Sequence, residues 1–434
     1  MGTFRDGTPQ ARRTGLDRRG AVRRGRFGLL AVALLLALSG CGGSGGGHWS
    51  GTGGGSAAPP SKQPVASSEI SFPADGASDV PASAEIAFTS KNADKTTVEL
   101  ADADGKAVQG SPRGDGTSWV PAKQLAWGTK YTATVTSTGS DGLPAVKKTT
   151  FTTMAKPANL VRISSQLADR ATYGVGMPII LGFNADIPKD KRADVQKRLF
   201  LTTTPPQEGA WSWFSGHELH FRPKEYWQTG TKIDLRAAFG GVPLGGKFGG
   251  NDLTIDAAIR PDKLMMVTDN ATHTMTVTKD GQVLKTIPVS LGKDSTPSSS
   301  GSMIVMVKKE QDWFDSDPSV PVGDPDYYHE IVYWTMRLTW GGQFIHSAPW
   351  SVDSQGKRNV SHGCTNISEP NGKWLYGLVM LGDPVIVKGT SRKLDWGDGW
   401  TDWNVSFEQY AKGSAIPYQP GQNGGAAPSP STSG

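Results

Sequence analysis

One cysteine and two histidines in the C-terminal part of this sequence have the types and spacing to do chemistry. Cys364 follows His362 by two residues and His346 by 18, and the only other cysteine among the 434 residues is Cys41. A thiol attacks an acyl carbon as its thiolate, and a nearby imidazole can accept the proton. The spacing predicts acyl transfer at Cys364, and a buried structural cysteine beside two satisfied histidines is the alternative.

The residues beside Cys364 and His346 suit the same reaction. Gly363 lets the backbone turn tightly, and the N–H groups of Gly363 and Cys364 are candidates to face a developing oxyanion. The backbone carbonyl of Ser347 is the candidate to orient the imidazole of His346. Another pair of histidines, His217 and His220, is an odd number of residues apart on a predicted strand, so the sequence predicts no metal site there.

The positive charge of the chain belongs to its first 40 residues. They hold eight Arg and two Asp, a net +6 against +5 for the whole chain, which leaves −1 for the rest. The body is therefore nearly neutral, and no nucleic acid partner is expected. An Arg-rich start followed by a short apolar run is typical of an export signal.

A lipid anchor is expected at Cys41. The twelve apolar residues 27–38 are too few to span about 30 Å of hydrocarbon, and Leu38-Ser39-Gly40-Cys41 resembles a bacterial lipobox. Cleavage before Cys41 and acylation of its thiol would hold the protein on the outer face of the membrane, through a flexible tether over 41–67. An ordinary secreted protein and a short uncut anchor are the alternatives. An acylated Cys41 leaves Cys364 without a disulfide partner, which favours a reactive thiol.

The body of the chain reads as mainly β. Short strands separated by turn dipeptides such as Asp104-Gly105 favour two immunoglobulin-like β-sandwich domains. A Gly-Thr-Lys run recurs 102 residues apart, at 128–130 and 230–232, as expected for two related domains. The expected helix over 370–380 is short, and the loops at 292–302 and 315–326 are candidates to line a site. The predicted boundaries are a signal peptide over 1–40, a tether over 41–67, sandwiches over 68–156 and 157–260, a β-rich catalytic domain over 261–390, a small C-terminal subdomain over 391–420 and a disordered tail over 421–434.

The motif around Cys364 is similar to the signature of L,D-transpeptidases with a YkuD-type catalytic domain. The resemblance extends to the segments that precede and follow it, and the lipobox with two immunoglobulin-like domains is similar to the membrane-anchored actinobacterial members. The residues that carry the catalytic resemblance are His346, Ser347, Ser361, His362, Gly363, Cys364, Thr365 and Asn366.

The resemblance implies crosslinking of bacterial peptidoglycan. Cys364 would attack a tetrapeptide stem between its third and fourth residues, and an amine of another stem would resolve the thioester. His346 would be the base, with Ser347 positioning it. His362, Gly363 and Asn366 would line or support the acyl site, and Tyr328 would belong to a lid. No cofactor or metal is implied, and carbapenems would acylate the thiol.

One departure from close relatives and several alternatives remain open. Trp340 stands where those relatives place a tyrosine that faces the site, so it either donates through its indole or walls the pocket. A weakly active, wall-binding scaffold lipoprotein is the alternative to an enzyme. Within the enzyme class, carboxypeptidase trimming and attachment of proteins to peptidoglycan are alternatives. The expected location is the extracytoplasmic face of the cell membrane, facing the cell wall.

Overall fold

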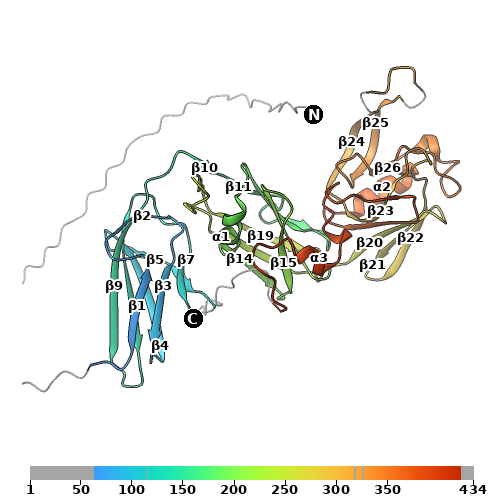
Figure 1. The fold of residues 1–434 in the computed structure, drawn as a ribbon. Coiled ribbons are helices and arrows are strands. Elements are labelled where there is room, and N and C mark those ends of the chain that lie inside the picture. The colour runs from blue at the N-terminus through green and yellow to red at the C-terminus, as the bar shows by residue number, and fades with distance from the viewer. Residues whose placement is uncertain (1–62, 115, 317–318, 325–326, 422–434) are drawn as a thin grey trace, which may run out of the picture. The chain divides into compact units, whose positions relative to one another are not determined.

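The computed structural model describes residues 63–114, 116–316, 319–324 and 327–421. The predicted signal peptide, Cys41, nearly all of the tether and residues 422–434 lie outside these described residues. The predicted mainly β fold is confirmed, with 45% strand and 8% helix (Figure 1). Among the described residues, no helix is both long enough and apolar enough to cross a membrane.

The first sandwich consists of two sheets packed on one apolar core. The strand orders are β1-β3-β7-β6 and β2-β9-β8-β4-β5. Alternating buried residues of β8, from Tyr131 to Val135, fill the core together with Trp119 and Phe151. The strands are β1 (Ser67–Phe72), β2 (Ala77–Val80), β3 (Ile86–Lys91), β4 (Lys95–Asp102), β5 (Ala107–Val108), β6 (Gly110–Pro112), β7 (Ser118–Pro121), β8 (Lys130–Thr138) and β9 (Pro144–Thr153).

The second sandwich has the larger core. Its two main sheets run β11-β13-β16-β15 and β12-β19-β17-β14, and β10 pairs with β18. Trp211, Trp213 and Trp227 are buried in this core. The elements are β10 (Leu160–Val161), β11 (Ile163–Ser165), β12 (Thr172–Tyr173), β13 (Ile179–Phe183), η1 (Lys189–Lys191), α1 (Arg192–Gln196), β14 (Leu199–Thr204), β15 (Gly209–Trp213), β16 (Glu218–Pro223), β17 (Lys232–Ala237), β18 (Phe248–Gly249) and β19 (Leu253–Ile259).

The third region carries the cysteine motif on one of two sheets. The six-stranded sheet runs β22-β21-β20-β28-β23-β29, and the four-stranded sheet runs β24-β25-β26-β27. Leu375 of α2 is buried in the core of this region, which fixes the helix against the strands. The elements are β20 (Leu264–Asp269), β21 (Thr274–Lys279), β22 (Gln282–Pro288), β23 (Ser299–Ile304), β24 (Val307–Asp315), β25 (His329–Arg337), β26 (Phe344–Ser347), η2 (Pro349–Ser351), β27 (Thr365–Ile367), α2 (Glu369–Leu378), β28 (Pro384–Lys388) and β29 (Arg392–Lys393).

One of the two loops predicted by composition differs in the structure. Residues 299–302 of the expected loop 292–302 belong to β23, where Gly301 pairs with Val387 of β28. The expected loop 315–326 lies between β24 and β25, and its described residues after Asp315 form no strand. Gly and Ser content indicates loops, but pairing with a neighbouring strand supplies the backbone hydrogen bonds that override this local preference.

The C-terminal segment folds back onto the second sandwich. It contains η3 (Asp402–Asn404) and α3 (Phe407–Ala411). The guanidinium of Arg222, on β16, lies 4.8 Å from the ring centre of Tyr410 and 4.6 Å from that of Trp403. Cation–π contacts and burial thus hold the segment in place.

Candidate active site

The parallel pairing of β26 with β27 brings the motif residues together. His346 stands opposite Asn366, and Ile345 stands opposite Thr365. Because side chains alternate along a strand, His346 and Asn366 face the same side of the sheet. Cys364 directly precedes β27, two residues before Asn366, so its side chain reaches the same side. The pairing of these two neighbouring strands thus brings together His346 and Cys364, which are 18 residues apart in the sequence.

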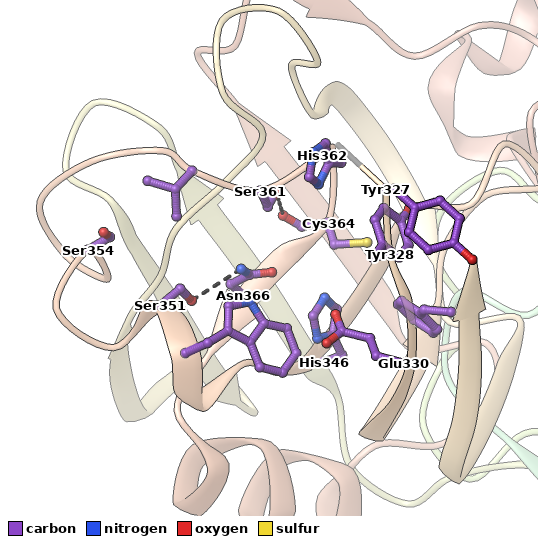
Figure 2. A pocket seen from close by; sticks show the side chains of 13 residues that line it. Tyr327, Tyr328, Glu330, His346, Ser351, Ser354, Ser361, His362, Cys364 and Asn366 are labelled. Carbon is purple, nitrogen blue, oxygen red and sulfur yellow. Dashed lines mark hydrogen bonds between the residues drawn. The ribbon is translucent and has the colours of Figure 1, made fainter. Parts of the chain in front are cut away.

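These side chains line a cavity of about 390 Å³. In the view of Figure 2, the Cys364 thiol lies between the rings of His362 and His346. Five elements contribute to the lining, since residues of β24, β25, β26, η2 and the segment around β27 all reach it. The lining residues are Phe314, Tyr327, Tyr328, Glu330, His346, Trp350, Ser351, Ser354, Val360, Ser361, His362, Cys364 and Asn366.

Cys364 is the free cysteine of the described residues. Its thiol donates a hydrogen bond of 3.6 Å to the carbonyl oxygen of Gly342. Burial raises the pKa of this thiol to about 11, although a hydrogen bond with the backbone of Phe344 opposes that rise. The resting state therefore holds a neutral thiol, which an adjacent base must deprotonate during attack.

His346 is oriented by its own neighbour in sequence. Its Nδ1 lies 2.9 Å from the carbonyl oxygen of Ser347. A carbonyl only accepts hydrogen bonds, so Nδ1 carries the hydrogen and Nε2 keeps its lone pair. Burial lowers the pKa of His346 to about 4, with the Ser347 hydrogen bond acting in the opposite sense. The imidazole is neutral near pH 7 and available as a base.

No hydrogen bond joins His346 to Cys364 within the described part of the chain. Both groups are neutral at rest, because low dielectric surroundings disfavour an imidazolium–thiolate pair. The geometry supports proton transfer from sulfur to Nε2 as the thiol attacks, when substrate completes the site. Apo sites commonly show looser contacts of this kind than substrate complexes.

Gly363 was expected to supply an oxyanion donor, but in this structure its N–H already has a partner within the motif. Its N–H donates to Oγ of Ser361 at 3.1 Å, and its carbonyl accepts from Oγ of Ser298 at 2.7 Å. Gly363 instead serves the turn itself, with φ at +129°, a value that L side chains rarely adopt. The N–H of Cys364 has no hydrogen bond partner among the described residues and is the candidate oxyanion donor.

Asn366 offers the cavity an acceptor. Its Nδ2 donates to Oγ of Ser351 at 3.2 Å, which fixes the amide, while Oδ1 is buried and has no partner in the described structure. A buried carbonyl oxygen without a hydrogen bond is costly, so a substrate N–H is the natural partner for Oδ1. Ser351 was not predicted as a site residue; only its place close to His346 in sequence hints at it.

The hairpin of β24 and β25 supplies one wall of the cavity. The ring of Phe314 packs edge-on against His346, with centroids 5.2 Å apart, and Tyr328 lies 5.4 Å from the ring of His362. Tyr328 therefore sits beside the site, as the lid expectation requires. Phe314 and Glu330 also line the cavity, and they were not predicted as site residues because they lie in strands just outside the expected loop 315–326.

Trp340 does not take the place expected of it. The cavity lining does not include Trp340, and the residue is 51% exposed. Its ring lies 6.4 Å from that of Trp400, and its carbonyl accepts a hydrogen bond from Arg337. Neither oxyanion donation nor walling of the pocket follows from this position. The nearby backbone acts on the site instead, through the Gly342 carbonyl that meets the thiol.

The described residues contain no group of three or more His, Cys, Asp or Glu side chains that could hold a metal ion. His220, the buried histidine of the second sandwich, has its two ring nitrogens on Asp402 and Glu218. The candidate site thus consists of a thiol, an imidazole, a backbone N–H and an amide oxygen around one cavity.

The sequence is similar to characterised families and proteins over most of its length. Residues 264–387 match the L,D-transpeptidase catalytic domain, and residues 77–243 match a bacterial Ig domain. L,D-transpeptidase 2 of Mycobacterium tuberculosis is 36% identical over 344 residues, which cover 79% of this chain and 83% of that protein. L,D-transpeptidase 5 of the same species is 32% identical, covering 82% of this chain and 79% of that protein.

A solved structure of LD transpeptidase LdtMt1 in complex with imipenem is 33% identical to this chain. It covers 54% of this chain and all of its own, with a TM-score of 0.46. The catalytic-domain match and the long alignments with the curated relatives agree with the motif around Cys364. The chain belongs to the L,D-transpeptidase family.

Proposed function

We propose that the chain crosslinks peptidoglycan, with Cys364 as nucleophile and His346 as its base. The observation that carries the proposal is the pairing of β26 with β27, which aims both side chains into one cavity. The Ser347 carbonyl fixes the tautomer of His346 with its lone pair on Nε2. Membership of the L,D-transpeptidase family supplies the reaction class.

The acylation step follows from these groups. The Cys364 sulfur attacks the carbonyl carbon between the third and fourth residues of a tetrapeptide stem, and its proton passes to Nε2 of His346. The Cys364 N–H stabilises the oxyanion that forms. When the tetrahedral intermediate collapses, the C–N bond breaks, the imidazolium returns its proton to the departing amine, and a thioester remains.

The second step reverses these roles. An amine of another stem attacks the thioester carbon, and His346 takes a proton from that amine. The C–S bond then breaks, the sulfur leaves as a thiolate that regains the proton, and a new amide joins the two stems. The buried Oδ1 of Asn366 is placed to accept a hydrogen bond from a stem amide during either step. Water in place of the amine would give carboxypeptidase trimming.

Incubation of the purified chain with tetrapeptide stems tests the proposal. Product analysis by mass spectrometry should show a dimer that has lost one terminal residue, and Cys364→Ala should form none. Accumulation of tripeptide alone would identify a carboxypeptidase. No conversion of any stem by a folded protein would overturn the assignment and favour a wall-binding scaffold.

We also infer a lipid anchor at Cys41 and a location on the outer face of the membrane. The support is the Leu38-Ser39-Gly40-Cys41 sequence after a twelve-residue apolar run. Anchored there, the chain would face the cell wall. Mass spectrometry of the N-terminal peptide from a membrane fraction should show diacylated Cys41, and Cys41→Ala should release the protein into the medium. Unmodified Cys41 in the membrane fraction would contradict the anchor.

Reaction of Cys364 with carbapenems is part of the same proposal. A strained β-lactam carbonyl is an acyl donor, so the thiol should open the ring and retain the ring-opened molecule as a thioester. Intact-mass measurement should show one covalent adduct per chain.

A further inference from the structure

A second cavity, of about 630 Å³, lies beside the catalytic cavity. Three of its lining side chains are cationic and one is anionic. The lining residues are His273, Lys293, Asp294, Ser295, Lys357, Arg358 and Asn359. This basic cavity is connected to the catalytic cavity by a direct contact, because Nζ of Lys293 lies 3.3 Å from Nε2 of His362, which lines the catalytic cavity.

The floor of the basic cavity is firmly built. Oδ1 of Asn359 accepts from the backbone N–H of Leu291 at 3.0 Å and lies 3.1 Å from Nδ1 of His273. Its Nδ2 donates to Oδ1 of Asn270 at 2.7 Å. The carbonyl of Arg358 accepts from Oγ of Ser290. These bonds fix the backbone that carries the two cations, although the cations themselves are exposed.

The charges of Lys357 and Arg358 are not neutralised by the protein. Neither forms an ion pair with any described residue, and the side-chain hydrogen bond of Arg358 goes to the neutral Oγ of Ser354 at 3.1 Å. Asp294 is the one carboxylate of the lining. Two adjacent cations on a fixed backbone suit an anion, since a guanidinium binds a carboxylate through two parallel hydrogen bonds. Cys364 follows Arg358 by only six residues.

We propose that the basic cavity binds a free carboxylate of a peptidoglycan stem peptide, and so selects stems with unamidated acids. This inference rests on the proposed function, because it takes stem peptides as substrates. The carboxylate belongs either to the donor stem, whose carbonyl Cys364 attacks, or to the acceptor stem. Lys357 and Arg358 bind it, and the contact of Lys293 with His362 couples the occupied cavity to the acyl site.

Paired synthetic stems, identical except for a carboxylate or a carboxamide, test this inference on the full chain. The wild type should convert the carboxylate stem with a kcat/KM about 3- to 10-fold higher, mainly through a lower KM, as expected for exposed charge pairs. The double variant Lys357→Gln/Arg358→Gln should lose the preference, so that the ratio of kcat/KM between the carboxylate and carboxamide stems falls to about 1. The charge-conserving double variant Lys357→Arg/Arg358→Lys should keep most of the preference for the carboxylate stem.

A matched control and two arms complete the design. Arg392→Gln/Lys393→Gln removes the same two charges from exposed residues of β29 that line neither cavity, and it should keep the preference. Two measurements tell which stem carries the bound carboxylate. Acylation of Cys364 by the donor stem alone, followed by intact mass spectrometry, shows whether the preference acts on the donor stem. Variation of the acceptor stem shows whether it acts on the acceptor. A wild type that converts both stems equally, or a preference that survives the double variant, overturns the inference. Failure to convert any stem overturns the proposed function instead.

Discussion

Two buried histidines in this protein differ in charge near pH 7: His346 is neutral and His220 is a cation. His346 is 4% exposed and His220 is fully buried, so both lose nearly all contact with water. Burial lowers the pKa of His346 to about 4, since its Nδ1 meets only the Ser347 carbonyl. Burial also acts to lower the pKa of His220, but Asp402 and Glu218 outweigh it and raise the pKa to about 9.

The comparison shows that the partners decide what a buried histidine can do. His220 is a fixed cation, with Asp402 at 2.8 Å, Glu218 at 2.6 Å and the ring of Phe214 stacked 4.8 Å away. It ties β16 to η3 and has no lone pair to accept a proton near pH 7. His346 has no carboxylate hydrogen bond partner in the described structure, so it stays neutral and can act as a base.

The largest effect is expected from Cys364→Ala, which removes the nucleophile that His346 serves. Turnover of stem peptides should fall by about 10³-fold or more, and the carbapenem adduct should vanish from the intact mass. Circular dichroism should show an unchanged fold, because the hydrogen bonds of the thiol are with backbone groups of Gly342 and Phe344. A remaining adduct on Cys364→Ala would place the nucleophile elsewhere.

Replacing each histidine by glutamine separates the two roles in activity. His346→Gln should lower kcat by about 10²- to 10⁴-fold, the range typical of a lost general base. His220→Gln, assayed where the variant is folded, should stay within about 3-fold of wild type. Similar losses in both variants, with both folded, would break the distinction.

For stability, the larger loss is expected from the substitution of His220 rather than of His346. His220→Gln removes the imidazolium that pairs with Asp402 and Glu218, and loss of one partner from a buried charge cluster costs about 3–5 kcal/mol. His346→Gln should cost about 1 kcal/mol, because one hydrogen bond to a carbonyl is lost. Urea denaturation measures both. Asp402→Asn serves as an independent check, since it should also destabilise the protein while it preserves shape.

The pKa shifts of His346 and His220 should make the stability of the protein depend on pH in opposite directions. The folded pKa of His346 lies below 6.5, so its contribution is present above pH 6.5 and is lost as the pH falls toward 4. The folded pKa of His220 lies above 6.5, so its contribution is present below pH 6.5 and is lost as the pH rises through 9. Each slope reaches at most about 1.4 kcal/mol per pH unit.

Unfolding free energies measured from pH 4 to 10 check these slopes. His346→Gln should flatten the acidic side of the profile and His220→Gln the alkaline side. An alkaline slope that is unchanged in His220→Gln would mean that another group, such as the Cys364 thiol with its pKa raised to about 11, dominates there.

The smallest effect is expected from Ser347→Ala. His346 is held by the carbonyl of residue 347, and a side-chain substitution leaves that carbonyl in place. Activity should change by less than about 3-fold, whereas the carboxylate partners of His220 are removable side chains. A loss of 10²-fold in a folded Ser347→Ala protein would assign the hydroxyl a role that the geometry does not give it.

The sequence alone determined the chemistry of the site. A single thiol outside the leader, with histidines two and 18 residues before it, restricted the nucleophile to Cys364 and the base to His346 or His362. The mainly β fold also followed from local patterns, because alternation and turn dipeptides are properties of neighbouring residues.

Only the tertiary structure decided which partner each group meets. The N–H of Gly363 donates to Ser361, Trp340 lies away from the cavity, and Phe314 reaches the cavity from β24, next to the expected loop 315–326. His220 and Asp402 are 182 residues apart, so no local pattern links them. The chemical type of each group is a property of its own residue, whereas its charge state and its access to the cavity depend on long-range packing that brings distant segments into contact.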